Sequence, residues 1–76
     1  MESHTHTLSS LFNQLGLDSK DSSIEQFINI HKPISKEIEL SKAFFWNNSQ
    51  SSFIKEMKEE DADWSGVIDQ LDVMLR

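Results

Sequence analysis

The sequence contains no cysteine, one proline and two glycines among its 76 residues. Without cysteine the chain forms no disulfide bond and no zinc site built on thiolates. With Gly16 and Gly66 as the two glycines, there is no glycine-rich loop for a phosphate and no glycine-framed nucleophilic serine. These absences point away from the common enzyme classes, so we expect no catalytic residues and no cofactor.

Long apolar stretches and clusters of basic residues are also missing. No segment approaches the roughly 20 apolar residues that span a bilayer, and the first residues lack the basic and apolar regions of a signal peptide. We therefore expect a cytoplasmic protein without a membrane partner. The net charge of −6 repels nucleic-acid phosphates and anionic lipids, so no nucleic-acid partner is predicted.

The negative charge is unevenly distributed along the chain. Residues 1–55 carry a net charge of −1, whereas residues 56–76 carry −5. Such an acidic end would attract a basic partner protein. The simpler interpretation, which we favour, is that the charge keeps a small protein in solution.

Apolar residues recur with the period of a helix at both ends of the chain. The first helix is predicted over residues 8–15, with Thr7 as its N-cap and Gly16 as its left-handed C-cap. The second is predicted to start with Asp18 or Ser19 as the cap and to end before Pro33.

The second half of the chain begins with a less regular stretch. Residues 34–43 are predicted as a loop with one turn of helix near Ser35. Asn47 then caps a third helix, in a capping box with Gln50. The apolar stripe of a fourth helix starts at Trp64 and includes Gly66, which we expect to lie close to a neighbouring helix.

Residues 48–75 could form one long helix or two short ones. The apolar positions keep nearly continuous helical phase throughout, and a single helix of this length would imply a dimer. Asp61 or Asp63 as a new N-cap argues for a break. We favour the break.

The predicted fold is therefore all-α, a small bundle of three to four short helices in one domain over residues 1–76, with residues 1–6 as a flexible tail. The predicted core consists of Leu11, Phe12, Leu15, Phe27, Ile28, Phe53, Trp64, Ile68 and Leu71. A core of this size rarely supplies more than about 3–5 kcal/mol of net stability. A homodimer is accordingly a prediction of its own.

Three consecutive aromatics, Phe44, Phe45 and Trp46, lie on the connector between the two predicted helical pairs. Three neighbours in sequence cannot all face one core, because successive side chains point in different directions in helices and strands. At least one ring must therefore point to a second core layer, to a partner or to solvent. We expect these rings to lie mostly in the core, but one of them could contact a partner or a second copy, since interfaces are enriched in such residues.

A family resemblance is carried by His6-Thr7-Leu8, Leu11-Phe12, Gln14-Leu15-Gly16-Leu17, Phe27-Ile28, His31, Pro33, Phe45-Trp46, Gln50, Phe53, Asp61-Ala62-Asp63-Trp64, Asp69, Leu71, Leu75 and Arg76. With these residues the chain resembles a family of short bacterial proteins of unknown function, domain-of-unknown-function family 2789. The resemblance implies a cytoplasmic bacterial protein and brings no activity.

Proline often precedes the Phe-Trp pair of that family, where this chain has Phe44. The resemblance therefore implies an extended stretch at residues 44–46. In that geometry Phe44 and Trp46 point inward and Phe45 is left for a partner.

Few polar residues suggest a site. His31 lies on the apolar face near the end of the second predicted helix, where a hydrogen-bonded packing role is favoured over proton transfer. His4 and His6 lack a third metal ligand nearby. The acidic run at residues 59–63 lacks the glycine turn and the spaced bidentate acid of a calcium loop, so we expect no metal site.

We expect a non-catalytic small acidic module for protein interaction or regulation. Its candidate partner contact is Phe44, Phe45 and Trp46, and its partner is an unknown protein or a second copy. The alternative is a protein that binds a small molecule or a metal in a cleft near His31 and the central aromatics.

Overall fold

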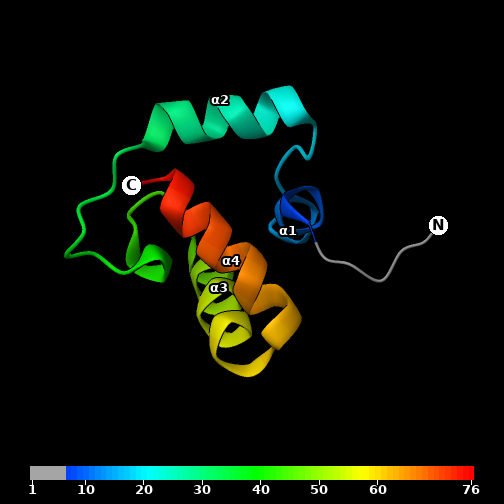
Figure 1. The fold of residues 1–76 in the computed structure, drawn as a ribbon, viewed down its shortest axis with the longest axis vertical. Coiled ribbons are helices and arrows are strands. Elements are labelled where there is room, and N and C mark those ends of the chain that lie inside the picture. Colours follow the sequence, from blue (N-terminus) through cyan, green and yellow to red (C-terminus); the bar gives the residue numbers. More distant parts are fainter. Residues whose placement is uncertain (1–6) are drawn as a thin grey trace.

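The computed structural model describes residues 7–76, which form four α-helices and a short 3-10 helix (Figure 1). The elements are α1 (Leu8–Gln14), α2 (Asp21–His31), η1 (Leu40–Lys42), α3 (Asn48–Glu60) and α4 (Ala62–Met74). No strand occurs within this range, and the predicted all-α bundle is confirmed. Residues 1–6, predicted as a flexible tail, lie outside the described residues.

Helix α1 begins and ends with the caps that the sequence predicts. The Thr7 side chain accepts a hydrogen bond from the Ser10 N–H at 3.1 Å. At the other end Gly16 has a φ of 75°, and the N–H of Leu17 bonds back to the Phe12 carbonyl oxygen at 2.9 Å. This arrangement is a Schellman motif, which turns Leu17 back onto the core.

Helix α2 begins later than predicted, because neither Asp18 nor Ser19 is its N-cap. Lys20 occupies the cap position, and its side chain makes no capping bond. Asp18 instead accepts the N–H of Lys20 at 3.1 Å, in a turn that precedes the helix. That bond, with a hydrogen bond from Ser23, holds the pKa of Asp18 below its ordinary value of 3.8.

Helices α3 and α4 form an antiparallel hairpin (Figure 1). The predicted capping box of Asn47 and Gln50 starts α3. Asp61 breaks the helical path with extended backbone (φ −131°, ψ 109°), and its side chain accepts the N–H groups of Asp63 and Trp64. The predicted break between two helices is confirmed, with Asp61 as the cap.

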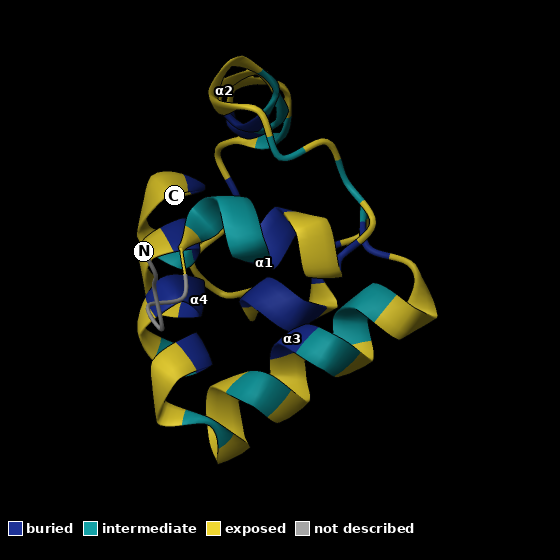
Figure 2. Cartoon of the chain, turned by 90° about the vertical axis from the view of Figure 1, so that its right-hand side faces the viewer, coloured by how far each residue is buried: buried dark blue, intermediate teal, exposed yellow. Residues whose placement is uncertain are grey.

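The core lies where α1, α3 and α4 face one another and where α2 turns its apolar side to them (Figure 2). Its buried apolar side chains are Leu11, Phe12, Leu15, Ile24, Ile28, Ile34, Leu40, Ala43, Trp46, Ile54, Trp64, Val67, Ile68, Leu71 and Leu75. Seven of the nine predicted core residues are among them. Phe27 and Phe53 are half-buried and border the core instead.

The loop between α2 and α3 is fastened to the C-terminal end of α4. The N–H of Ile34 donates to the Leu75 carbonyl oxygen at 2.8 Å. Arg76 donates to the carbonyl of Ser35 and forms an ion pair with Asp72 at 2.8 Å. These bonds give an otherwise irregular segment a defined position beside the helices.

The start of α3 is fastened to two other elements in the same way. The Gln50 side chain, already part of the capping box, donates to the Leu15 carbonyl oxygen at the end of α1, at 2.9 Å. Ser51 donates to the carbonyl of Ser41 in η1. The residues just before α3 are therefore held from both sides.

Candidate interaction site

The aromatic stretch at residues 44–46 forms a turn and not the extended segment that the family resemblance implies. The N–H of Trp46 donates to the Ala43 carbonyl oxygen at 3.3 Å, which places Phe44 and Phe45 at the two central positions. Phe44 is 92% exposed, Phe45 is half-buried and Trp46 is 8% exposed. The outward ring is thus Phe44, and the prediction that Phe45 is left over is wrong.

Trp46 holds this turn against the core. Its indole Nε1–H donates to the Leu40 carbonyl oxygen at 2.8 Å, and this bond is buried. Its ring stacks on Phe27 of α2, with 5.6 Å between centroids. Phe27 in turn meets the buried Phe12 edge to face, at 5.2 Å. A chain of ring contacts therefore runs from the core to the turn.

His31 lies in the same set of rings. Its ring centroid is 4.3 Å from that of Phe27 and 4.2 Å from that of Phe45. Its Nδ1 lies 2.8 Å from the Phe27 carbonyl oxygen, a distance at which Nδ1–H donates and fixes the ring plane. The prediction of a hydrogen-bonded packing residue is confirmed.

A shallow pocket of about 200 Å³ opens between the turn and the start of the preceding loop. Its lining residues are His31, Pro33, Ile34, Ser35, Ile38, Lys42, Ala43, Phe44 and Phe45. Ile38, at its edge, is 42% exposed. We call the exposed parts of Ile38, Phe44 and Phe45, together with this pocket, the Phe44 surface.

The Phe44 surface is apolar at its centre and carries charge at its edge. Lys42 lines the pocket and faces Glu39 at 3.6 Å, with both side chains well exposed. Such an exposed pair contributes little to stability. The surface offers one projecting ring, one apolar recess and an exposed ammonium group.

Sequence reasoning missed Ile38 as a site residue. It was assigned to an irregular loop, where its apolar side chain had no evident role. One local signal was present, because Ile38 lies between Glu37 and Glu39. An apolar residue flanked by two charges in a loop is typical of an exposed position.

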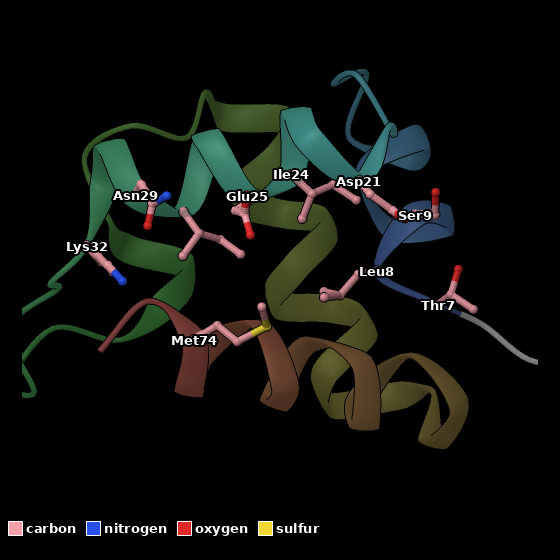
Figure 3. Close-up of a pocket in the computed structure, with 10 residues that line it drawn as sticks. Thr7, Leu8, Ser9, Asp21, Ile24, Glu25, Asn29, Lys32 and Met74 are labelled. Atoms are coloured by element: carbon pink, nitrogen blue, oxygen red, sulfur yellow. The ribbon is translucent and has the colours of Figure 1, made fainter.

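Two further hollows are not lined by the aromatic residues 44–46. The larger, about 580 Å³, is a groove between α2 and the ends of α1 and α4 (Figure 3). Ile24 and Ile28 of α2 line it, and Met74 of α4 lies opposite Ile24. The other, about 400 Å³, is lined largely by charged side chains of the α2–α3 loop, α3 and α4, among them Lys36 and Lys55.

The remaining candidate ligands are not brought together. Within residues 7–76 no three histidine, aspartate or glutamate side chains converge on a point where a metal could bind. The acidic run at residues 59–63 covers the last two residues of α3, the Asp61 cap and the start of α4. His4 and His6 lie outside the described residues.

Comparison with known proteins agrees with this architecture. The family described as "Protein of unknown function (DUF2789)" matches residues 1–75. The chain belongs to this family. The chain is similar to protein CV0237 from Chromobacterium violaceum, whose structure was solved by solution NMR. The two sequences are 39% identical and the two folds superpose with a TM-score of 0.80, over 99% of this chain and 94% of that one. No curated protein gives a significant match.

Membership of the family carries the fold and assigns no activity. None of the helices within the described part of the chain is long and apolar enough to cross a membrane. What this family member does must therefore be argued from its own surface.

Proposed function

We propose that this protein is a non-catalytic module that binds another protein chain through the Phe44 surface. The observation that carries the proposal is the position of Phe44, a large apolar ring that is 92% exposed. Burying a phenylalanine side chain is worth about 1.5–3 kcal/mol. A chain with so small a core leaves that free energy unused unless a partner covers the ring.

The rigidity of the turn supports the proposal. The bond from Trp46 to Leu40 and the bond from Trp46 to Ala43 fix the backbone on both sides of Phe44. A turn whose backbone is fixed before binding loses less conformational entropy when a partner arrives. Preorganised aromatic side chains next to a recess are typical of the residues that dominate binding energy.

The alternative, a small molecule or metal held near His31, has less support. The pocket there has a volume of about 200 Å³, whereas sites for drug-sized ligands occupy about 300–1,000 Å³. His31 is engaged with Phe27 through Nδ1, and within the described residues no second histidine or acid lines this pocket.

Affinity capture from cells of the native host tests the proposed function. The wild-type chain is compared with Phe44→Ala and with Ile30→Ala, which removes another exposed apolar side chain (67% exposed), on α2. We expect wild type and Ile30→Ala to retain the same protein, including the untagged chain itself, and Phe44→Ala to lose it. If all three proteins retained that partner, or if none of them retained any partner, the result would contradict the proposal.

A further inference from the structure

The least acidic stretch of the chain is the one that presents Phe44. Residues 32–46 hold three lysines and two glutamates, a formal charge of +1, while the rest of the chain carries −7. The acidic α3–α4 turn lies at the far end of the helical hairpin from the α2–α3 loop (Figure 1). Two copies of this chain therefore repel each other least when they meet at the Phe44 surface.

The same surface carries both a projecting group and a recess that fits it. Phe44 stands out from the turn, and the pocket of about 200 Å³ beside it is lined by the apolar side chains of Pro33, Ile34, Ile38 and Ala43. In a two-fold symmetric dimer each protomer presents the same patch, so that patch must be complementary to itself. A ring and an apolar recess on one face meet this requirement.

We infer that a second copy of this chain covers the Phe44 surface, in a two-fold symmetric dimer in which each Phe44 enters the pocket of the other protomer. The inference rests on the proposed function and names its partner. Each ring is received between Ile38 and Phe45. Both rings and both recesses are removed from solvent at the same time, so the two symmetric contacts form cooperatively.

The size of the molecule allows this contact. A specific interface removes about 600 Å² or more from each partner, which is roughly an eighth of the 5103 Å² surface of this chain. The α2–α3 loop, which carries Phe44, lies on one side of the α3–α4 hairpin (Figure 1). Salt screens the repulsion between two chains of charge −6, so added salt strengthens the dimer.

Sedimentation equilibrium of the full chain up to high micromolar concentration tests the dimer. We expect wild type and Val73→Ala, which changes a residue 75% exposed on α4, to show the same monomer–dimer equilibrium. Phe44→Ala and Phe44→Lys should raise the dissociation constant at least tenfold. Both substitutions are at an exposed position, so the fold is retained, and circular dichroism checks this. A monomeric wild type, or a dimer that survives Phe44→Lys, would overturn the inference.

The geometry is tested by mixing isotope-labelled and unlabelled chains. Isotope-filtered NMR should detect nuclear Overhauser effects between the Phe44 ring of one chain and the Ile38 methyl groups of the other. A dimer in which these two side chains do not meet would contradict the proposed arrangement.

A photoreactive phenylalanine analogue at position 44, introduced in living cells, separates this inference from the proposed function. A cross-link between two copies of the chain supports both. A cross-link to a different protein overturns the dimer and retains the interaction module. Absence of any cross-link to protein, together with a monomeric wild type, overturns both.

Discussion

Two aromatic residues, Phe44 and Trp46, have opposite environments although only Phe45 separates them in the sequence. Trp46 is buried, and its indole N–H satisfies the Leu40 carbonyl group. Phe44 has no polar group to place and is almost fully exposed. The turn between Ala43 and Trp46 makes this possible, because its central side chains point away from the backbone bond that closes it.

Replacing Trp46 by phenylalanine should destabilise the protein by about 1–3 kcal/mol, because it removes the buried hydrogen bond to Leu40 and part of a buried ring, although the Leu40 carbonyl oxygen keeps its bond from the Ala43 N–H. Phe44→Ala, two positions away, should change the free energy of unfolding by less than about 0.5 kcal/mol, as expected for an exposed side chain. Urea denaturation followed by circular dichroism measures both. Equal losses for the two variants would show that the rings share one structural role.

The packing role of His31 could be predicted from the sequence, but one of its two ring partners could not. Its place on the apolar face near the end of a helix predicted a packing role, and the ring contacts with Phe27 and Phe45 confirm it. The partner Phe45 could not be foreseen. It comes from a turn that is distant in sequence and is positioned by Trp46.

Individual side chains determine where three of the four helices within residues 7–76 begin. Thr7, Asn47 and Asp61 each accept a hydrogen bond from the first turn of the helix that follows. In α2 the cap position is occupied by Lys20, whose side chain cannot accept one. The acidic and polar residues that precede α2 instead stabilise the turn that leads into it.

Asp61→Ala should destabilise the protein by about 1 kcal/mol, because it removes the acceptor for the N–H groups of Asp63 and Trp64. Asp61→Asn keeps an oxygen at the same place and should recover most of that loss. Thermal unfolding monitored by circular dichroism compares the three proteins. If asparagine and alanine were equally destabilising, the charge of Asp61 and not its hydrogen bonds would be the main contribution.

The two glycines should respond to alanine in opposite ways. Gly66 was expected to allow close packing, but a Cβ built there meets no atom within 4 Å, so that prediction is wrong. Gly66→Ala should stabilise α4 by about 0.5–1 kcal/mol. Gly16 has a φ of 75°, and Gly16→Ala should destabilise by about 1 kcal/mol. Chemical denaturation measures both, and two changes of the same sign would contradict the assignment.

Of the four helices within residues 7–76, α2 packs least extensively against the other helices. A groove of about 580 Å³ separates part of it from the end of α4, where Met74 faces Ile24 (Figure 3). At its C-terminal half the ring contacts of Phe27 with Phe12 and Trp46 attach it to the core. The aromatic residues thus connect α2 to the turn that presents Phe44.

Amide hydrogen exchange should reflect this difference. Amides of α2 should exchange faster than those of α4 near Ile68 and Leu71, two side chains that are fully buried, because segments with fewer buried contacts open at lower free energy. Exchange measured by NMR under native conditions gives both sets from one sample. Equal protection in the two helices would indicate that the molecule opens only as a unit.

Local chemistry was enough to predict the helices and most of their ends. Helical periodicity, N-caps and a glycine after the last turn of a helix depend on residues close in sequence. Thr7, Gly16, Asn47 and the break at Asp61 could therefore be identified without knowing which residues lie nearby in space. The same holds for the apolar stripe of α4, whose spacing alone assigned Ile68 and Leu71 to the core.

The sites that could not be predicted depend on contacts between residues distant in sequence. The direction of Phe44 depends on the buried bond from Trp46 to Leu40, and the pocket beside it depends on the loop that Ile34 fastens to Leu75. Phe27 and Phe53 have core-like spacing but lie at the border, because the number of neighbours around a helix is set by how the other helices pack. The all-α class follows from the sequence by local physical rules, whereas the candidate interaction surface exists only once α2, the loop and α4 have come together.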